Sequence, residues 1–237
     1  MHDSPGPMGT ESPPPEDPMR FADHGAERIA GAAIAILNPL QHALAALPTD
    51  RPGLRLHAIP ALADLTGAAS AIGQCAQRVA GRRVLPVRAI LFDKTATTNW
   101  SLAWHQDRTI NVRARVDVAG FGPWTVKSGL VHVAPPFAVL ARMVTLRVHL
   151  DDVPRDNAPL LIAPGSHRMG VIREDRIGSV VAQCGVHRCT ARAGDIWAYA
   201  TPILHASEAA VIPRRRRVLQ LDYAGAPLPG GLEWSGI

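Results

Sequence analysis

Short apolar runs fill the last two thirds of this 237-residue chain and constrain its fold more than any other feature. Proline, glycine, aspartate or asparagine bounds each run, as is usual at the ends of strands. Eight such strands with turns between them are typical of a β-sandwich or barrel. The expected strands are 84–92, 101–107, 144–151, 160–163, 187–193, 195–200, 203–210 and 217–223.

The part of the chain before these strands has a helical character. Residues 21–47 are rich in alanine, isoleucine and leucine, and we expect the helix there to break at Asn38-Pro39 because the residue before a proline disfavours helix. A second helical stretch is expected over 61–80, and Gly81 after it is a typical helix end.

The domain organisation follows from these patterns. Residues 1–19 hold many prolines and acidic groups with few large apolar side chains, which predicts a disordered tail. We expect one domain over 20–237, with a helical part (21–80) and a β core (84–223). Residues 111–143 contain no expected strand and are predicted to form a long irregular loop, a kind of segment that often carries binding function.

The excess of positive charge is local. The chain has a formal net charge of +5, and Arg214 to Arg217 supply four of those charges, so no broad basic face is expected. A run of arginines could still bind a polyanion, but the aromatic platform expected for single-stranded nucleic acid is missing. The prediction is therefore a small-molecule partner and no nucleic acid.

Other features of the sequence indicate in which compartment the protein is expected. No apolar run approaches the roughly 18 residues that a membrane helix needs, and the start of the chain lacks a basic-then-apolar export signal. The three cysteines are too few for a disulfide framework. We expect a soluble cytoplasmic protein without membrane contact, whose oligomeric state the sequence leaves open.

Two His-x-Asp pairs occur at expected strand ends, His105 with Asp107 and His149 with Asp151. Alternation along a strand points both members of a pair to one face. A site of two histidines and one carboxylate for non-haem Fe(II) needs a third ligand from a distant strand, and His205 is the candidate. Four expected strands separate Asp107 from His205, enough to wind back to the first pair. Only three separate Asp151 from His205, so the first pair is favoured.

The last strand has two chemically different faces. Counting in twos, one face carries Arg217, Leu219, Leu221 and Tyr223, and the other carries Arg216, Val218, Gln220 and Asp222. The first suits packing beneath helices. The second would face a polar cavity, where the guanidinium of Arg216 could bind a carboxylate through two hydrogen bonds and Ser207 could add a hydroxyl. An ordinary solvated strand start explains the arginines equally well.

Several short motifs occur together in a characteristic order and resemble the phytanoyl-CoA dioxygenase family. They cover roughly residues 84–223, and they are specific as a set, although each alone is weak. The motifs are Leu91-Phe92-Asp93-Lys94, Trp104-His105-Gln106-Asp107, Asn157-Ala158-Pro159-Leu160, Pro164-Gly165-Ser166-His167, Ala193-Gly194-Asp195, His205-Ala206-Ser207 and Pro213-Arg214-Arg215-Arg216-Arg217.

The resemblance implies a mainly β fold with flanking α-helices, the double-stranded β-helix (jelly-roll, cupin-like). It implies Fe(II) as cofactor, 2-oxoglutarate as cosubstrate and O2 as oxidant. Carried over by position, His105, Asp107 and His205 match the iron ligands, and Arg216 matches the arginine that binds 2-oxoglutarate, in agreement with the analysis of strand faces.

The chain departs from the family at two places. Arg147 stands where some members have a tryptophan beside the cosubstrate, so we expect Arg147 near 2-oxoglutarate or substrate. Asn157-Ala158 stands where the family often has Asn-Gly, which bears on turn geometry.

The function implied is hydroxylation of an unactivated C–H bond of a small organic substrate, with release of succinate and CO2. Because Asp107 is present, the halogenating members of the family, which carry a small residue there, are a poor match. Trp124, Lys127 and His132 are candidate substrate contacts in the long loop. The alternative is a non-catalytic jelly-roll protein that uses its metal site for binding or sensing. The family name transfers no substrate.

Overall fold

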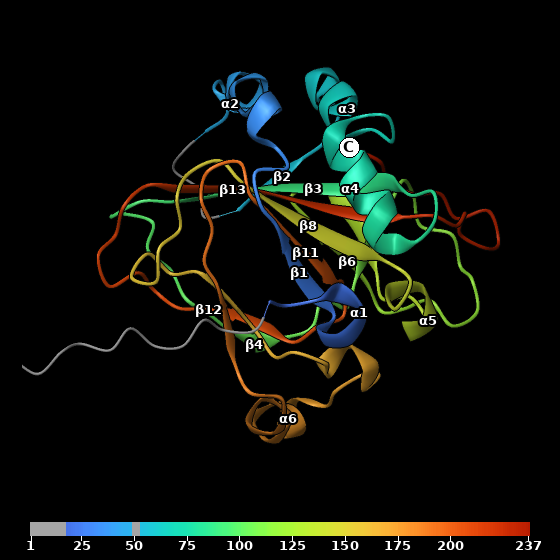
Figure 1. Cartoon of the computed structure of the whole chain (residues 1–237). Helices are drawn as coiled ribbons and strands as arrows, with labels where there is room; N and C mark the ends of the chain where they lie inside the picture. The colour runs from blue at the N-terminus through green and yellow to red at the C-terminus, as the bar shows by residue number, and fades with distance from the viewer. Residues whose placement is uncertain (1–17, 49–52) are drawn as a thin grey trace, which may run out of the picture.

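The computed structural model describes residues 18–48 and 53–237, in which two of the three antiparallel sheets face each other as a double-stranded β-helix (Figure 1). Most of the predicted tail, residues 1–17, lies outside the described residues. Within the described ranges, no helix is both long enough and apolar enough to span a membrane.

The larger sheet has six strands in the order β1-β11-β8-β13-β3-β2, and all neighbouring strands are antiparallel. β8 and β13 are its two middle strands, and β13 shares the longest pairing with β3 on its other side. The strands are β1 (Ala26–Ile29), β2 (Leu54–Leu56), β3 (Leu85–Lys94), β8 (Val144–His149), β11 (Ile196–Ala200) and β13 (Arg216–Ala224).

The smaller sheet has four strands in the order β10-β9-β12-β4. These are β4 (Leu102–His105), β9 (Leu160–Ile162), β10 (His187–Cys189) and β12 (His205–Ser207). All eight strands expected from the sequence are therefore confirmed, most of them somewhat shorter than expected.

Helices cover the outer face of the larger sheet, as Figure 1 shows above β3 and β13. They are α2 (Leu37–Leu44), α3 (Pro60–Thr66) and α4 (Ala71–Ala80), and their apolar side chains form one buried cluster with β8 and β13. Leu219, Leu221 and Tyr223 are fully buried in it, which confirms the apolar face expected for the last strand. The Tyr223 hydroxyl donates to the backbone oxygen of Thr66 at 2.7 Å.

The other helices are short. α6 (Ile177–Cys184) packs on the outside of the smaller sheet, below β12 and β4 in Figure 1. The remaining helical turns are α1 (Phe21–His24), η1 (Ile34–Ile36), α5 (Phe137–Leu140), η2 (Ser166–Arg168) and η3 (Glu174–Arg176).

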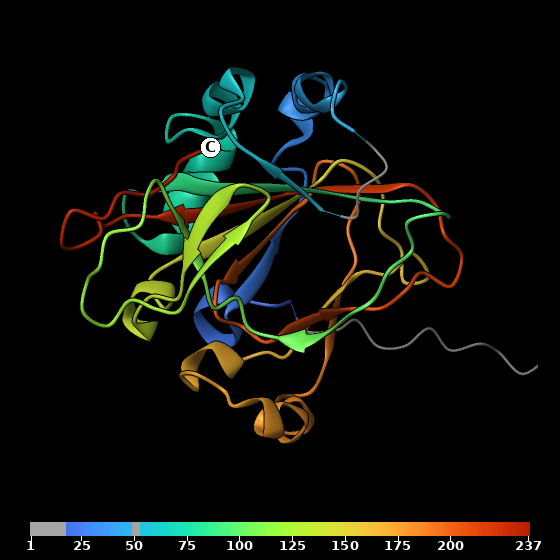
Figure 2. The same cartoon turned by 180° about the vertical axis from the view of Figure 1, so that it is seen from behind.

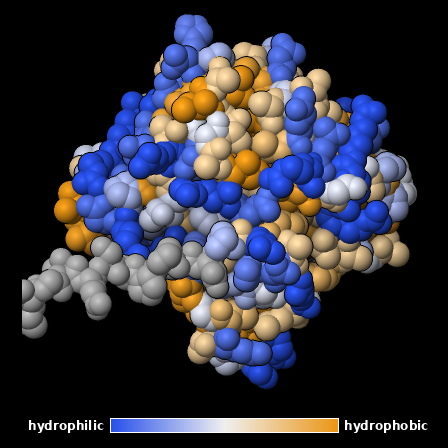
Figure 3. All heavy atoms as spheres, viewed as in Figure 1, coloured by the Kyte–Doolittle hydropathy of each residue, from blue (hydrophilic) through white to orange (hydrophobic). Residues whose placement is uncertain are grey.

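On the surface seen in Figure 3, hydrophilic and hydrophobic side chains are interspersed.

The N-terminal helical region differs from the expectation. Part of the predicted helix 21–47 is strand β1, which pairs with β11 far along the chain. The break predicted at Asn38-Pro39 is wrong, because Pro39 lies in the first turn of α2, where backbone N–H groups have no helical partner. The predicted helix 61–80 is interrupted before Ser70, whose hydroxyl caps α4, and Gly81 ends α4 as expected.

The prediction of an irregular loop over 111–143 is also wrong. This segment contributes a three-stranded sheet of β5 (Ile110–Val112), β6 (Trp124–Lys127) and β7 (Leu130–Val133), in the order β5-β7-β6. Figure 2 shows β6 and β7 in yellow-green in front of the larger sheet. Ser128 and Gly129 join them with φ of 53° and 78°, as a two-residue turn of type I′ requires.

The inner face of the larger sheet is polar. Gln220 of β13 lies between Ile90 and Arg147 in the register, and Asp222 lies between Arg88 and Thr145. Arg216, at the start of the same strand, is buried. Because adjacent positions along β13 project to opposite faces, the strand that anchors the core under the helices also lines the space between the sheets.

Candidate metal centre

His105 and His205 are opposite each other on the neighbouring antiparallel strands β4 and β12. Their ring centroids are 4.2 Å apart. Asp107 follows two residues after the end of β4, and its carboxylate and the two imidazoles each offer an atom within 4.8 Å of the others. Among residues 18–48 and 53–237 this is the one such cluster of potential metal ligands.

The backbone sets the tautomer of both imidazoles. Nδ1 of His105 lies 2.8 Å from the backbone oxygen of Ala103, and Nδ1 of His205 lies 3.0 Å from that of Ile203. A carbonyl oxygen only accepts, so both Nδ1 atoms carry the proton and both Nε2 lone pairs are free for a metal. Burial lowers the pKa of His205 to about 4, although Asp107 acts in the opposite direction. His205 is therefore neutral near pH 7.

Arg88 of β3 holds the third donor. Its Nη2 donates to Asp107 Oδ2 at 2.9 Å, and its Nε donates to Asp222. Burial by itself would raise the pKa of Asp107, but Arg88 and the two imidazoles lower it below the ordinary value. The carboxylate is therefore ionised, and its second oxygen can face a metal.

Gln106, between His105 at the end of β4 and Asp107, anchors the loop that follows β4. Its amide nitrogen donates to the backbone oxygens of Gly170 and Pro202 at 3.0 and 2.8 Å, and its oxygen accepts from Ile172 N–H at 2.8 Å. Because Gln106 makes all three bonds on one side of the chain, the side chains of His105 and Asp107 are directed to the other side.

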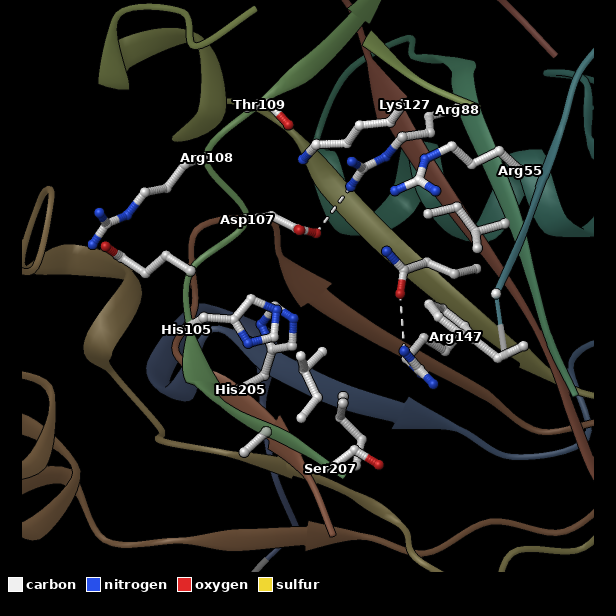
Figure 4. A pocket seen from close by; sticks show the side chains of 18 of the residues that line it. Arg55, Arg88, His105, Asp107, Arg108, Thr109, Lys127, Arg147, His205 and Ser207 are labelled. Carbon is white, nitrogen blue, oxygen red and sulfur yellow. Dashed lines mark hydrogen bonds and ion pairs between the residues drawn. The ribbon is translucent and has the colours of Figure 1, made fainter. Parts of the chain in front are cut away.

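A cavity of about 430 Å³ opens between the sheets around these residues (Figure 4). In the figure, Arg55, Arg88 and Lys127 lie above His105 and His205, on the side of Asp107, while Arg147 lies to the right of the histidines and Ser207 below them. The lining residues are Gly53, Arg55, Arg88, Ile90, Phe92, Trp100, Leu102, His105, Gln106, Asp107, Arg108, Thr109, Lys127, His132, Arg147, Leu160, His205, Ala206, Ser207, Arg216 and Gln220.

Arg216 is one of two buried guanidinium groups at the end of the cavity away from Arg88. Its Nη1 donates to the backbone oxygen of Ala158, while its Nε is buried without a partner. Burial and the neighbouring Arg147 lower its pKa to about 9, so it remains charged at neutral pH. Arg147 donates to Gln220 at 2.9 Å and likewise has a buried Nε without a partner.

Ser207 lies on the same strand as His205 and is held by Lys94. The Nζ of Lys94 is 3.1 Å from Ser207 Oγ and donates to the backbone oxygens of Trp100 and Glu208 at 2.6 and 2.7 Å. Lys94 thus ties β3 to the end of β12 and orients the hydroxyl beside the cavity.

The other three arginines of the run 214–217 have carboxylate partners. Arg214 pairs with Asp156, Arg215 with Asp93, and Arg217 with Asp151. Arg216 is thus the member of the run that points into the cavity. The positive charge that dominates the composition is largely neutralised where it stands.

The remaining candidates from the sequence separate into two groups. Lys127 and His132 line the cavity, whereas Trp124, the first residue of β6, is not among its lining residues and packs against the apolar cluster that includes Ile110 and Val133. In the second His-x-Asp pair, His149 is buried with neither ring nitrogen bonded, and Asp151 is occupied by Arg217.

Four residues at the site were not anticipated from the sequence, namely Arg55, Arg88, Lys94 and Gln106. A weak signal existed for Arg88, a charged residue inside an otherwise apolar strand. Its partner Asp222, however, is 134 positions further along the chain. The contacts of Lys94 and Gln106 are similarly remote.

The donor set suits a divalent transition metal. Two imidazoles and one carboxylate, with protein on one side and open space on the other, are the arrangement typical of non-haem Fe(II) sites. Nickel is also bound by nitrogen and oxygen ligands of this kind.

Comparison with known proteins gives a consistent result. Residues 41–218 match the sequence profile of the family described as phytanoyl-CoA dioxygenase (PhyH). No curated protein matches the chain by sequence.

Several solved structures share the fold. EctD from S. alaskensis, solved with 2-oxoglutarate and 5-hydroxyectoine, has a TM-score of 0.61 at 17% identity, covering 86% of this chain and 73% of EctD. HygX from Streptomyces hygroscopicus, solved with nickel and 2-oxoglutarate, has a TM-score of 0.57 at 15% identity, covering 87% of this chain and 85% of HygX. The non-heme alpha ketoglutarate dependent carbocyclase SnoK from nogalamycin biosynthesis has a TM-score of 0.59 at 17% identity, covering 92% of this chain and 85% of SnoK. The predicted jelly-roll fold is confirmed.

Proposed function

Because the chain belongs to the phytanoyl-CoA dioxygenase family, we propose that it is an Fe(II)- and 2-oxoglutarate-dependent oxygenase that hydroxylates a C–H bond of a small organic substrate. The reaction joins one oxygen atom of O2 to the substrate and the other to the cosubstrate, which leaves as succinate and CO2.

One observation carries this proposal. His105, Asp107 and His205 converge within 4.8 Å, and both imidazoles are held in the tautomer that leaves Nε2 free. A structural histidine pair has no need of two free lone pairs beside an ionised carboxylate. The arrangement instead satisfies the requirements of a metal site.

The three side chains would hold Fe(II), which with 2-oxoglutarate and O2 supplies the oxidising chemistry. The protein contributes ligand geometry, charge and exclusion of water. Arg88 keeps the Asp107 carboxylate ionised and directed, while the loop anchored by Gln106 keeps the ligands of β4 in place.

Arg216 would bind the distal carboxylate of 2-oxoglutarate through its unpartnered Nε edge. Ser207, held by Lys94, would donate its hydroxyl to the same carboxylate. Arg147 would stand beside them as a second guanidinium, in the place where the family resemblance puts an aromatic side chain. The two guanidinium groups would together offset the negative charge of this carboxylate.

Hydroxylation is the outcome we propose because the carboxylate position of the metal site is filled by Asp107. With that position filled, none is left for a halide, which a halogenase requires. SnoK is described as a carbocyclase, so the fold also serves other oxidative outcomes, and product analysis is part of the test.

The test is turnover by the purified full chain with Fe(II), ascorbate, 2-oxoglutarate and O2, followed as succinate formation. We expect succinate from wild type and none from Asp107→Ala. Asp117→Ala is the control, since Asp117 is an exposed aspartate that pairs with the exposed Arg115. A coupled activity retained in full by Asp107→Ala would contradict the ligand assignment. Metal binding without any succinate would favour the non-catalytic metal-binding protein.

A further inference from the structure

Two basic side chains near Asp107 have no charged partner among the described residues. Arg55 enters from β2 and Lys127 from the end of β6, and both line the cavity. Figure 4 shows them beside Arg88 on the Asp107 side of the histidine pair. The Nε of Arg55 is buried without a hydrogen-bond partner.

Arg88 does not account for this excess of charge, because it is already neutralised. Its guanidinium bonds both Asp107 and Asp222. Arg55 and Lys127 add positive charge that is not ion-paired with any carboxylate of the described residues. Burial and, after it, the nearby Arg88 lower the pKa of Arg55, and Asp107 acts in the opposite direction. An anion placed beside Arg55 would raise this pKa.

His132 of β7 adds an unused polar group to the same place. Its side chain lines the cavity and is 1% exposed, yet neither ring nitrogen has a partner. Buried polar groups without partners are costly and rare. Burial, then Arg88, Lys127 and Arg55, lower the pKa of His132 to about 4, so the ring is neutral and offers one N–H donor at neutral pH.

These groups lie beside Arg88, toward the other end of the cavity from Arg216. On β13, Arg216 and Asp222 are six residues apart, about 20 Å along a strand, and Arg88 bonds Asp222. Arg55 is opposite Ile90, which is opposite Gln220, four residues from Arg216. The distal carboxylate of 2-oxoglutarate would already have Arg147 and Arg216 as partners. Arg55 and Lys127 are left for a different anion.

We propose that Arg55, Lys127 and His132 bind the anionic group of the substrate, which is therefore a small organic acid carrying a carboxylate or a phosphate. This inference rests on the proposed function. The cavity of about 430 Å³ is near the small end of ligand pockets, roughly 300 to 1,000 Å³, and must hold the cosubstrate as well, which limits the size of the substrate inside it.

The first part of the test separates this inference from the proposed function. 2-Oxoglutarate is titrated by calorimetry into the full chain loaded with Ni(II), which keeps the complex from turning over. We expect binding to wild type, to Arg55→Gln and to Lys127→Gln, and weak binding to Arg216→Gln. Absence of binding to wild type would contradict the proposed function. Loss of binding in Arg55→Gln would overturn the inference, because Arg55 would then serve the cosubstrate.

In the second part, sodium phosphate and sodium propionate are titrated separately into the complex with Ni(II) and 2-oxoglutarate. We expect one of them to bind wild type and to bind Arg55→Gln or Lys127→Gln about tenfold more weakly or worse. Binding of phosphate alone indicates a phosphate ester, and binding of propionate a carboxylic acid. The control is Arg113→Gln, an exposed arginine paired with Glu233, which should bind the probe like wild type.

The inference is overturned if neither anion binds wild type, or if both cavity variants bind the anion as wild type does. A further arm compares carboxylic acids with their neutral amides as stimulants of succinate formation. We expect stimulation by acids and not by the matching amides, and loss of that difference in Lys127→Gln. Equal stimulation by amides would argue against an anion site.

Discussion

The Arg88 guanidinium reaches from β3 of the larger sheet to Asp107, which follows β4 of the smaller sheet, with Nη2 2.9 Å from Oδ2. The same guanidinium bonds Asp222 through Nε, and Asp222 accepts the Thr145 hydroxyl at 3.0 Å. The proposed metal carboxylate is thus the outer end of a buried polar chain that begins inside the larger sheet. Residues that orient a metal ligand in this way typically change metal affinity by 10- to 100-fold when altered.

Arg88→Lys should therefore weaken metal binding by about 10- to 100-fold. Lysine keeps the charge but lacks the planar fork that serves two carboxylates at once, and the pKa of Asp107 should rise toward its ordinary value. Calorimetric titration with Ni(II) at neutral and at mildly acidic pH measures both effects, with the larger loss expected at the lower pH. Unchanged affinity at both pH values would contradict the role of Arg88, and Arg113→Lys is the exposed control.

Arg216→Gln should weaken 2-oxoglutarate binding about 10- to 100-fold, because a charge-assisted hydrogen bond contributes about 1.5 to 3 kcal/mol. Arg214→Gln changes the same residue type two positions away, where the side chain pairs with Asp156. It should leave 2-oxoglutarate affinity unchanged. Equal losses in the two variants would show that the arginine run acts through general charge rather than through the buried guanidinium.

The metal-free protein should lose stability as pH falls. The pKa values of His149 and His205 are lowered by burial, so the unfolded chain takes up protons first. The free energy of unfolding should fall below about pH 6.5 by up to about 1.4 kcal/mol per pH unit for each imidazole. Urea unfolding between about pH 5 and pH 7 measures the slope. His149→Gln should reduce it, and an unaltered slope would count against His149 as a contributor.

Ala158→Gly should stabilise the protein by about 0.5 to 1 kcal/mol, since a left-handed conformation costs an L-residue about 1 to 2 kcal/mol and glycine loses part of that gain through chain entropy. Ala158 has φ of 50°. Ala198, buried in β11, is the control, and Ala198→Gly should destabilise. Thermal unfolding distinguishes the two. A lower melting temperature for Ala158→Gly would refute this account.

The family's Asn-Gly at this turn now has a physical explanation, because glycine adopts the conformation that Ala158 must take. Arg216 donates to the backbone oxygen of Ala158. The departure at this turn therefore touches the cosubstrate end of the cavity, and it is not confined to turn geometry.

Alternation made the last strand predictable. With one face apolar and the other carrying Arg216, Gln220 and Asp222, only one orientation could pack beneath helices. The cluster of His105, Asp107 and His205 was predictable from two patterns together. The pair His105 and Asp107 stands at a strand end, and the number of strands that follow brings His205 back beside it.

Long-range pairing was the part that the sequence could not disclose. β1 is four residues within an alanine-rich stretch that has helical composition, and its strand conformation comes from pairing with β11. The turn Ser128-Gly129 was a local signal for the β6–β7 hairpin, overlooked among glycines and prolines that suggested a loop. Arg88 and Gln106 act through partners remote in the chain, so their roles emerge only when the sheets are assembled.

The ion pairs of the arginine run also fix the register of β13 in the larger sheet. A slip of one residue would still present a guanidinium to the cavity, since four arginines stand in succession. It would also turn Leu219 and Leu221 away from the helices and separate Arg215 and Arg217 from Asp93 and Asp151. The residue type alone therefore does not decide which of the four arginines enters the cavity. The ion pairs of Asp93 and Asp151 and the burial of Leu219 and Leu221 fix the register of β13, and this register places Arg216 there.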